Sequence, residues 1–473
     1  MKKKLLILSC PLLLFSNTID FDSSLSKTLA NNKGLKAKAL DIEVSKLDVQ
    51  EANSYNYGSL VFAENISRTN NAGYVFGAKL ASREATFGDF GFSDFLGGVG
   101  QALNNSADYD AFKAQMTDPN MANQLLATQP DDLNNPDART NFETKLTYKV
   151  PIFTGYKLTN GKKMAKLQIL AKTAKYNYDK KALGLEVLKA YNGAVASKEF
   201  IKATKKAKEA TSSFVSFANE LYKEGLVTNI DVKQAQVYDM GVDAKMIEAQ
   251  NRYELALSYL KFLTSDDTIT DVGSFKNINI DNKLLTVLQT NANENRDDFK
   301  WMQYNTDTMK TKIEFESASN YPMIGAQLEY GYNDDSLSID SDHDYYMGAV
   351  GLSYTIFDGA NVSKKIEKAK IEHKKTQHYL EYMKDGIKLE VEKNLLTLDA
   401  KTKVLTQKIK AQNLSEEVLL QSEELYKNHL INMSNLLMQQ ANQQKANAET
   451  IMAKYEQSCA AAVLKISLGQ SLK

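Results

Sequence analysis

The sequence has few of the residues that cross-link or rigidify a compact domain. Among its 473 residues are only two cysteines, six prolines and one tryptophan. Cys10 lies in a predicted leader, so no intramolecular disulfide is expected in the processed chain. Cys459, on an alanine-rich helix, is interpreted as a small core residue. The 58 basic and 58 acidic residues cancel, so bulk charge predicts no nucleic-acid partner.

Motifs that carry chemistry are also absent from the sequence. It contains no P-loop, no nucleophile elbow and no dinucleotide fingerprint. The four histidines are scattered and lack the spacing of a metal site. Five aspartates between Asp334 and Asp344 lack the spacing of an EF-hand, and a solvated loop is the preferred interpretation. We therefore expect no enzyme, no catalytic residue, no cofactor and no metal site.

Residues 1–17 are predicted to be a signal peptide. Three lysines follow Met1, an apolar run extends from Leu5 to Phe15, and small or polar residues come next. The run is shorter than the roughly 20 residues that a membrane-spanning helix needs. Lipidation at Cys10 is a weaker alternative, because too short an apolar run precedes this cysteine.

The chain contains itself twice, with an offset of 204 residues. Phe153-Thr154-Gly155 returns as Phe357-Asp358-Gly359, and Leu221-Tyr222-Lys223 returns as Leu425-Tyr426-Lys427. A repeat of this kind predicts two similar structural units that pack side by side. We place the first repeat at residues 18–273 and the second at residues 274–473.

Four segments, two in each repeat, alternate apolar and polar residues with the period of a β-strand. They lie within residues 58–80, 141–150, 323–333 and 346–356. The first segment is less regular, but an alternating pattern is clear at its end, where every second residue is apolar or aromatic: Tyr74, Phe76, Ala78 and Leu80. Tyrosines near the ends of the apolar faces are typical of a transmembrane β-barrel. The strands alone fit a half-buried soluble sheet equally well.

Long helices without an internal proline are predicted between the strand pairs. Residues 160–223 and 361–427 carry apolar residues at the three-and-four spacing of coiled coils. At 1.5 Å per residue each would span roughly 100 Å. Four helices of about half this length are predicted at residues 24–54, 229–263, 282–317 and 434–468. Two short helices stacked end to end would match one long helix, which predicts a tall helical hairpin in each repeat.

One connection breaks the similarity of the repeats. The two strands of the first repeat are joined by residues 81–139, whereas residues 334–344 join those of the second. The long connection is rich in Asn, Asp, Gly and Phe. Long loops are usually functional or disordered, and we expect this one to extend outward from the strands.

The order of these segments resembles that of the TolC-type outer-membrane efflux protein family over essentially the whole mature chain. The most specific likeness is Gly225–Val232, which is similar to a helix-turn-helix tip of that family. Val150–Gly155 and Thr355–Gly359 resemble its two strand-to-helix junctions. Phe76–Leu80 and Leu133–Pro136 are similar to first-repeat segments of many members.

The resemblance implies a mixed, mainly α fold with duplicated coiled-coil hairpins and four strands per chain. Three chains would close a twelve-stranded outer-membrane β-barrel, which removes every sheet edge from the bilayer. An α-helical tunnel would continue into the periplasm of a Gram-negative bacterium. Such a homotrimer would be a gated duct and not an enzyme. Its implied partners are a periplasmic adaptor, an inner-membrane transporter and outer-membrane lipid.

The resemblance also assigns roles to three groups of residues. The strand-to-helix junctions contain Pro151, Phe153, Gly155, Phe357 and Gly359. The first tip, residues 222–232, would meet the adaptor through Gly225, Leu226, Val227, Thr228 and Asp231. The second tip, residues 426–436, would form the periplasmic aperture with Tyr426, His429, Leu430, Ile431 and Asn435.

Local chemistry makes its own prediction for the first tip. Gly225 can take the left-handed conformation that ends a helix. Thr228 or Asp231 can then cap the helix that follows.

The second tip departs from the family pattern. His429 stands where glycine is usual, Ile431 where some members have arginine, and Asn435 where aspartate is common. An aperture closed by ion pairs is therefore not expected. The closed state would rest on hydrogen bonds of Tyr426 and on apolar packing at the tip.

Two other functions fit the same sequence features. One is the exit duct of a type I protein-secretion system, which would pass unfolded protein. The other is a soluble periplasmic coiled-coil scaffold, which would need neither paired amphipathic strands nor a large outer loop.

Overall fold

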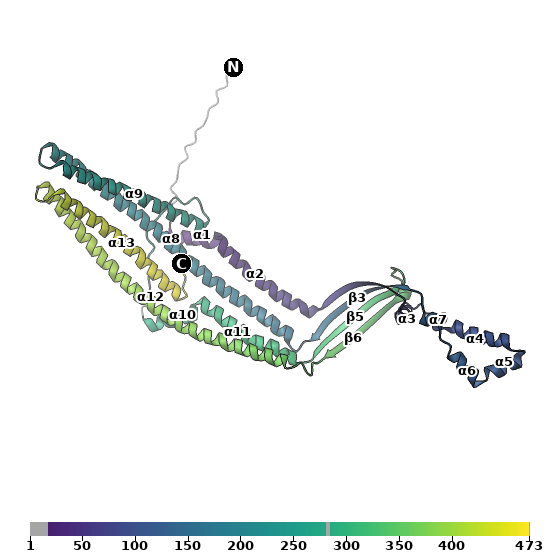
Figure 1. The fold of residues 1–473 in the computed structure, drawn as a ribbon. Helices are drawn as coiled ribbons and strands as arrows, with labels where there is room; N and C mark the ends of the chain where they lie inside the picture. The colour runs from purple at the N-terminus through teal and green to yellow at the C-terminus, as the bar shows by residue number, and fades with distance from the viewer. Residues whose placement is uncertain (1–17, 281–283, 473) are drawn as a thin grey trace, which may run out of the picture. The chain divides into compact units, whose positions relative to one another are not determined.

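A computed structural model of the chain describes residues 18–280 and 284–472. The predicted signal peptide, with Cys10, and the predicted helix start at Asn282 lie outside these residues. The described residues form two compact units (Figure 1). The helical unit lies within residues 1–47, 164–310 and 370–473, and the strand unit consists of residues 48–163 and 311–369.

Four of the helices form two similar hairpins. Helices α8 (Lys157–Lys223) and α12 (Asn361–Lys427) each contain 67 residues and are related by the 204-residue offset. They are followed by α9 (Asn229–Thr264) and α13 (Met433–Ser467). The predicted mainly helical fold with duplicated long hairpins is confirmed.

The other two half-length helices are each broken, contrary to the prediction of single helices. The first consists of α1 (Phe21–Asn31) and α2 (Lys33–Ser54), and the second of α10 (Leu285–Asn295) and α11 (Asp297–Ser317). The breaks, at Asn32 and Arg296, are 264 residues apart. Asn32 interrupts its helix because its side chain accepts a hydrogen bond from the N–H of Leu35 (3.0 Å), as an N-cap does.

Arg296 ends its helix with a buried guanidinium. Nη1 donates to Glu390 of α12 (2.6 Å), and Nε and Nη2 donate to Asp298 (3.0 and 2.7 Å). Burial disfavours the charged form, but these hydrogen bonds outweigh burial and raise the pKa of Arg296. The break therefore fixes α10 and α11 against the second long helix.

The core of the helical unit lies where both hairpins meet the N-terminal segment. A short parallel pair, β1 (Thr18–Ile19) and β4 (Asp271–Val272), joins the residues just before α1 to the segment after α9. Fully buried side chains come from many elements and include Leu25, Leu188, Tyr191, Leu260, Ile269, Val391 and Leu464. Burying a side chain of this size stabilises a fold by about 1.5–3 kcal/mol.

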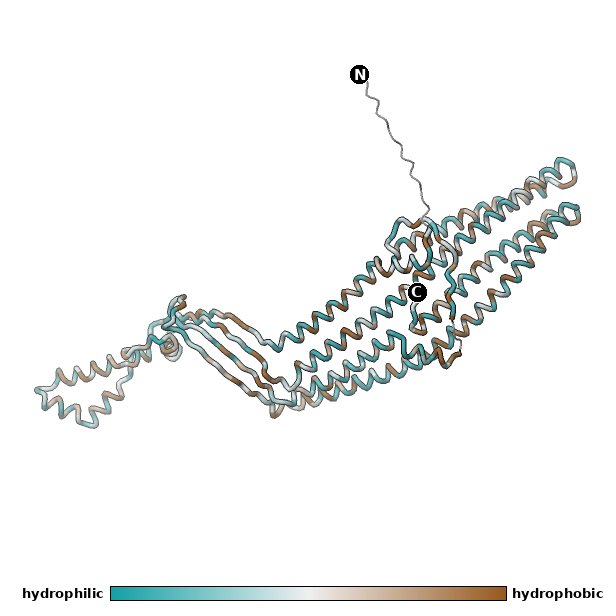
Figure 2. The backbone as a smooth tube through the Cα atoms, turned by 180° about the vertical axis from the view of Figure 1, so that it is seen from behind, coloured by the Kyte–Doolittle hydropathy of each residue, from teal (hydrophilic) through white to brown (hydrophobic). Residues whose placement is uncertain are grey.

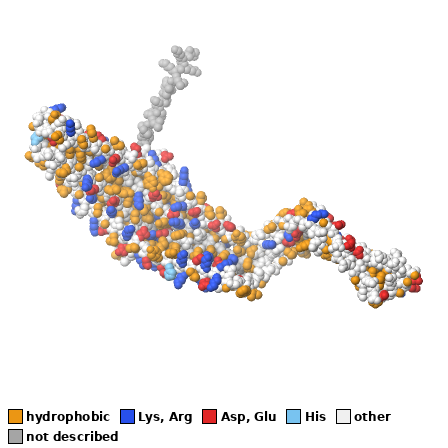
Figure 3. Space-filling model, in the orientation of Figure 1, with side chains coloured by type: hydrophobic (Ala, Val, Ile, Leu, Met, Phe, Trp, Pro, Cys, Tyr) orange, Lys and Arg blue, Asp and Glu red, His pale blue; other side chains and the backbone are white. Residues whose placement is uncertain are grey.

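Charges on the helical unit are interspersed. Figure 3 shows Lys and Arg alternating with Asp and Glu over the visible face, as the formal net charge of zero would suggest. No helix in residues 18–280 or 284–472 is both long and apolar enough to cross a membrane.

The strand unit contains a four-stranded antiparallel sheet in the order β2-β3-β5-β6. The strands are β2 (Ser59–Thr69), β3 (Arg139–Phe153), β5 (Met323–Asp334) and β6 (Asp344–Ser353). The register Ser59↔Lys149 in the first strand pair repeats as Met323↔Ser353 in the second. An offset of 264 residues thus relates β2 to β5, and an offset of 204 residues relates β3 to β6.

The register gathers the apolar residues of all four strands on one face. This face contains Leu60, Phe62, Ile66, Phe142, Leu146, Tyr148, Leu328, Tyr330, Tyr346, Val350 and Leu352. Three acids also lie on this face: Glu64, which accepts a hydrogen bond from Thr144, and Asp334 and Asp344, where β5 ends and β6 begins. The opposite face is polar, with Glu329 accepting hydrogen bonds from Thr147 (3.0 Å) and Tyr345 (2.9 Å). The predicted two-faced strands are confirmed.

Two strand predictions were wrong at their ends. Residues 74–80 belong to helix α3 (Ala72–Ala81), because Asn71 caps it by accepting a hydrogen bond from the N–H of Tyr74. The alternating aromatic residues Tyr74 and Phe76 therefore lie on a helix. This helix buries Val75, which is 3% exposed. Strand β6 ends at Ser353 and not at Ile356, which is 91% exposed.

The connection between β2 and β3, for which a long outer loop was predicted, contains several short helices. After α3 come α4 (Phe92–Asn105), α5 (Tyr109–Met116), α6 (Pro119–Leu126) and α7 (Asp131–Asn134). Asp108 and Asp118 accept hydrogen bonds from the first turns of α5 and α6 (2.8 Å each). We call residues 85–138 the insertion; apolar segments, brown in Figure 2, recur along its helices. Short 3-10 turns lie at Tyr55–Tyr57, Gly88–Phe90, Ala318–Asn320 and Ser341–His343.

Candidate functional site at the tips and junctions

The first tip is a Schellman turn between α8 and α9. The N–H of Gly225 donates to the carbonyl of Tyr222 (3.1 Å), and the N–H of Leu226 donates to that of Leu221 (2.9 Å). This pair of hydrogen bonds satisfies carbonyls that the helix end leaves free. Gly225 has φ +72°. The prediction that it ends the helix in the left-handed conformation is confirmed.

The second tip repeats this turn with a different residue. The N–H of His429 donates to the carbonyl of Tyr426 (3.0 Å), and the N–H of Leu430 donates to that of Leu425 (2.8 Å). His429 has φ +61°, although it carries a side chain. The turn therefore holds a conformation that costs an L-residue roughly 1–2 kcal/mol.

The caps that follow the two turns differ. The carboxylate of Asp231 accepts hydrogen bonds from the N–H of Thr228 (3.0 Å) and from its hydroxyl (2.8 Å). The predicted capping of α9 is thus confirmed. At the second tip, Asn432 accepts a hydrogen bond from the N–H of Asn435 (2.9 Å), so the cap carries no charge.

Each tip presents one exposed leucine and one half-buried aliphatic residue. Leu226 is 56% exposed, and its repeat equivalent Leu430 is 69% exposed. Val227 and Ile431 pack partly against an apolar cluster that the two hairpins share. Its buried members are Phe214, Ala218, Leu221, Val232, Ala235, Leu419, Tyr426, Met433, Leu436 and Leu437. The exposed leucines are thus displayed on a rigid base.

Tyr426 belongs to this cluster. Its side chain is 4% exposed, and its ring meets that of Phe217 edge to face, with centroids 5.8 Å apart. Its hydroxyl has no hydrogen-bond partner among the residues that the structure describes. Burial raises the pKa of Tyr426, and the negative charge of Asp231 adds to the effect. Within one chain, Tyr426 is therefore a packing residue; its contact with Phe217 has no signal in the sequence.

The first strand-to-helix junction is closely packed. Gly155 and Tyr156 both have left-handed φ angles (+62° and +69°). A Cβ on Gly155 would lie 2.3 Å from the carbonyl oxygen of Ala318. Just before the junction, the register of β3 against β5 shifts between Pro151 and Phe153. This is a position that tolerates proline within a sheet.

Aromatic rings cover the first junction. The ring of Tyr156 lies between those of Phe153 and Tyr321, with centroid distances of 5.4 and 6.0 Å. Tyr321 comes from the second repeat, directly after the 3-10 turn Ala318–Asn320 that follows α11. The sequence offered one signal for this contact, the Tyr321-Pro322 pair where a helix gives way to a strand.

The second junction has the same backbone but no cover. Gly359 and Ala360 have φ of +68° and +67°. Phe357 is 86% exposed, and a Cβ on Gly359 would meet nothing within 4 Å. The two junctions therefore differ in their packing, although their sequences repeat.

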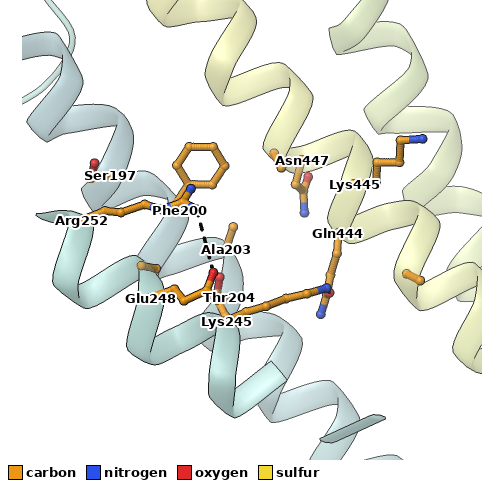
Figure 4. A pocket seen from close by; sticks show the side chains of 13 residues that line it. Ser197, Phe200, Ala203, Thr204, Lys245, Glu248, Arg252, Gln444, Lys445 and Asn447 are labelled. Carbon is orange, nitrogen blue, oxygen red and sulfur yellow. Dashed lines mark hydrogen bonds and ion pairs between the residues drawn. The ribbon is translucent and has the colours of Figure 1, made fainter. Parts of the chain in front are cut away.

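A pocket of about 250 Å³ lies between α8, α9 and α13. Figure 4 shows Phe200 and Thr204 of α8 on one side and Gln444 of α13 on the other, with the side chain of Lys245 reaching toward Gln444. Arg252 and Glu248 on its rim form a loose ion pair (3.9 Å), and both are largely exposed. No group in this pocket has the burial or pairing of a catalytic residue.

Comparisons with known proteins match the whole architecture. A sequence profile described as "Outer membrane efflux protein" matches residues 104–265 and 288–470. A search of curated proteins found no match.

Among solved structures, the chain is similar to the CmeC outer membrane channel of Campylobacter jejuni (TM-score 0.73, 13% identity, 95% of this chain and 85% of that chain). It is also similar to the outer membrane protein VceC of Vibrio cholerae (TM-score 0.71, 13% identity, 96% and 97%). A third similar structure is the open state of the MtrE outer membrane channel of Neisseria gonorrhoeae (TM-score 0.72, 14% identity, 96% and 89%).

Proposed function

Because the chain belongs to the outer membrane efflux protein family, we propose that it is the trimeric exit duct of a tripartite efflux system. It is a protein of the outer membrane, and its relatives are channels rather than enzymes. In the proposed system, small molecules pass from an inner-membrane transporter and a periplasmic adaptor through this duct to the outside.

The observation that carries the proposal is the incomplete sheet of the strand unit. One face is apolar across all four strands, but β2 and β6 are edge strands without a second partner among the described residues. Tyr346 and Val350 on β6 are 88% and 72% exposed. A sheet edge exposed to hydrocarbon leaves backbone polar groups unpaired, at a cost of several kcal/mol each. Pairing with further copies would remove these edges.

The repeat indicates how the copies would pair. Within one chain, the second strand of the first repeat, β3, pairs with the first strand of the second, β5. The equivalent partner of β6 is β2, which is available only from a neighbouring copy. Leu146 lies opposite Tyr330 in the existing pair. The same register would place Val350 opposite Ile66 of the next copy.

The uncovered second junction supports this arrangement. Tyr321 covers the first junction, and its repeat equivalent is Tyr57, which is 69% exposed. In a ring of copies, Tyr57 of one chain would cover Phe357 and Gly359 of the next. Three copies with four strands each would make the twelve-stranded barrel that the family resemblance implies.

The proposal for the first tip is that the adaptor docks there. Leu226 is exposed, while the caps and the apolar cluster beneath hold the turn rigid. An exposed apolar side chain on a preorganised turn is the kind of anchor that dominates protein interfaces. Gly225, Val227, Thr228 and Asp231 would shape this anchor. We also propose, from the same family resemblance, that the second tip forms the periplasmic aperture. Its residues would be Tyr426, His429, Leu430, Ile431 and Asn435.

The first experiment measures the state of the mature protein. Membranes are fractionated, the protein is extracted in mild detergent, and the particle mass is determined. We expect a detergent-dependent outer-membrane particle of three chains. A stable monomer or dimer in mild detergent would contradict the trimeric duct.

A second experiment compares the two tips. Leu226→Asp should weaken capture of a cognate adaptor by about tenfold or more, the effect of removing an interface anchor worth more than about 1.4 kcal/mol. Leu430→Asp is the matched control, because this leucine occupies the equivalent position of the other tip. Equal losses for both variants would show that the adaptor does not distinguish the tips as proposed.

A further inference from the structure

Three potential ligand atoms meet at the base of the insertion. Glu84 follows α3, Asp334 ends β5, and His343 lies in the turn before β6. One ligand atom from each lies within 4.8 Å of the other two. Glu84 and Asp334 are 250 residues apart in the sequence, so no spacing motif connects these three residues.

The buried Asp334 and the partly exposed His343 face each other without a hydrogen bond. Asp334 is 6% exposed, and its carboxylate accepts hydrogen bonds from the N–H of Asp335 (2.6 Å) and the hydroxyl of Ser338. Nδ1 of His343 is buried 3.3 Å from Oδ2 of Asp334. It has no hydrogen-bond partner among the described residues. Facing a carboxylate is favourable for this nitrogen only if it carries a proton or if a cation lies between the two atoms.

The third carboxylate is held in place from behind. Ser82, which is fully buried, donates a hydrogen bond to Glu84 (2.7 Å), and Arg139 at the start of β3 donates another. Arg83 between Ser82 and Glu84 has φ +57°, a left-handed conformation that turns Glu84 toward β5. Outer partners that orient a carboxylate are a regular feature of metal sites, and backbone strain gathers at functional sites.

The charge around the three residues is strongly negative. The β5–β6 connection carries five aspartates, at 334, 335, 340, 342 and 344, and Glu84 adds a sixth carboxylate. Among the residues that the structure describes, two guanidinium groups pair with this set, Arg139 with Glu84 and Arg83 with Asp344. A bound cation would offset part of the excess.

We propose that Glu84, Asp334 and His343 bind one divalent cation of the zinc class. An imidazole nitrogen with two carboxylate oxygens suits Zn²⁺, whereas Ca²⁺ and Mg²⁺ take oxygen ligands. The ion would join the base of the insertion to the β5–β6 connection and stabilise the outer end of the strand unit. This site does not depend on the proposed export function.

The test uses the full-length mature chain in detergent. The protein is stripped with a chelator, equilibrated with Zn²⁺ and freed of excess metal, and bound zinc is measured by mass spectrometry. We expect one zinc per chain, and a loss of affinity of about tenfold or more in His343→Gln. His378→Gln is the matched control, because the side chain of His378 is 67% exposed and its carboxylate neighbour, Glu381, is itself 76% exposed. It should bind zinc as the wild type does.

Two further measurements keep the result decisive if a variant folds poorly. Bound Co²⁺ should give the absorption bands of nitrogen and oxygen coordination in the wild type. Zn²⁺ should also raise the thermal midpoint of the wild type but not that of Glu84→Gln. The proposal is overturned if the wild type binds no zinc, or if His343→Gln retains the same zinc. It is also overturned if the His343→Gln substitution changes how the thermal midpoint depends on pH, while Zn²⁺ has no effect on the midpoint of the wild type.

Discussion

At the residue level, the two tips require the same left-handed backbone conformation but place different residues in it. Gly225 and His429 occupy equivalent positions, share the left-handed conformation and make the same pair of backbone hydrogen bonds. Glycine meets this demand without steric cost. Histidine does not, so the second tip stores strain that the first tip lacks.

This difference predicts opposite effects of matched substitutions. His429→Gly should raise the free energy of unfolding by about 1 kcal/mol, because it removes the left-handed strain. Gly225→Ala should lower it by a similar amount, and by strain alone, since a Cβ at Gly225 meets nothing within 4 Å. Urea unfolding followed by circular dichroism measures both. A decrease for His429→Gly would mean that the imidazole contributes contacts worth more than the strain.

Local signals explain which tip residues were predictable. The roles of Gly225, Thr228 and Asp231 in the turn follow from chemistry within a few residues of each. The burial of Tyr426 against Phe217 depends on how the chain folds back on itself. The meeting of Glu84, Asp334 and His343 depends on sheet register across the whole strand unit, so neither was predictable.

At the scale of elements, the sequence predicted helices better than their interruptions. The bounds of α8, α9, α12 and α13 agree with the predictions within three residues, because Gly225, Thr228 and their equivalents end and begin these helices locally. The break at Arg296 requires Glu390, which is distant in sequence. Helix α3 was predicted as strand from its period-two pattern alone, and the helix cap at Asn71 was missed.

The first junction yields an element-scale prediction. Gly155→Ala should destabilise the strand unit by more than about 2 kcal/mol, because it combines left-handed strain with a clash against the carbonyl of Ala318. The thermal midpoint of the detergent-solubilised protein measures this.

Gly97→Ala serves as the control for that substitution. Gly97 lies within α4 and has open space around its Cβ position, so alanine there should stabilise by about 0.5–1 kcal/mol. Equal thermal midpoints for Gly155→Ala and wild type would show that the backbone at the junction can shift away from the added methyl group without cost.

At the scale of the whole molecule, the repeat predicts the contact between copies. In a background of Cys459→Ser, Ile66→Cys combined with Val350→Cys should form disulfides between neighbouring chains upon oxidation. Directly opposed residues of antiparallel strands have Cβ atoms about 4.5–5.5 Å apart, within reach of a disulfide. Denaturing gels should then show covalent trimers.

A shift of one residue provides the control. Ile66→Cys with Ala349→Cys places the two side chains on opposite faces of the sheet, and should give little cross-linking. Equal cross-linking of both pairs would contradict the register, and none from either would contradict the contact between β6 and β2.

In the proposed assembly, the insertion would determine how the molecule looks from outside the cell. Each chain carries two strand pairs, but only the first ends in helices; the other ends in a nine-residue turn, residues 335–343. The proposed assembly would therefore be nearly sixfold along its strands and threefold at its outer rim. An antibody or a phage would meet three acidic helical lobes separated by three low gaps. Surface variation in such a protein could accumulate in the lobes without touching the register that closes the ring.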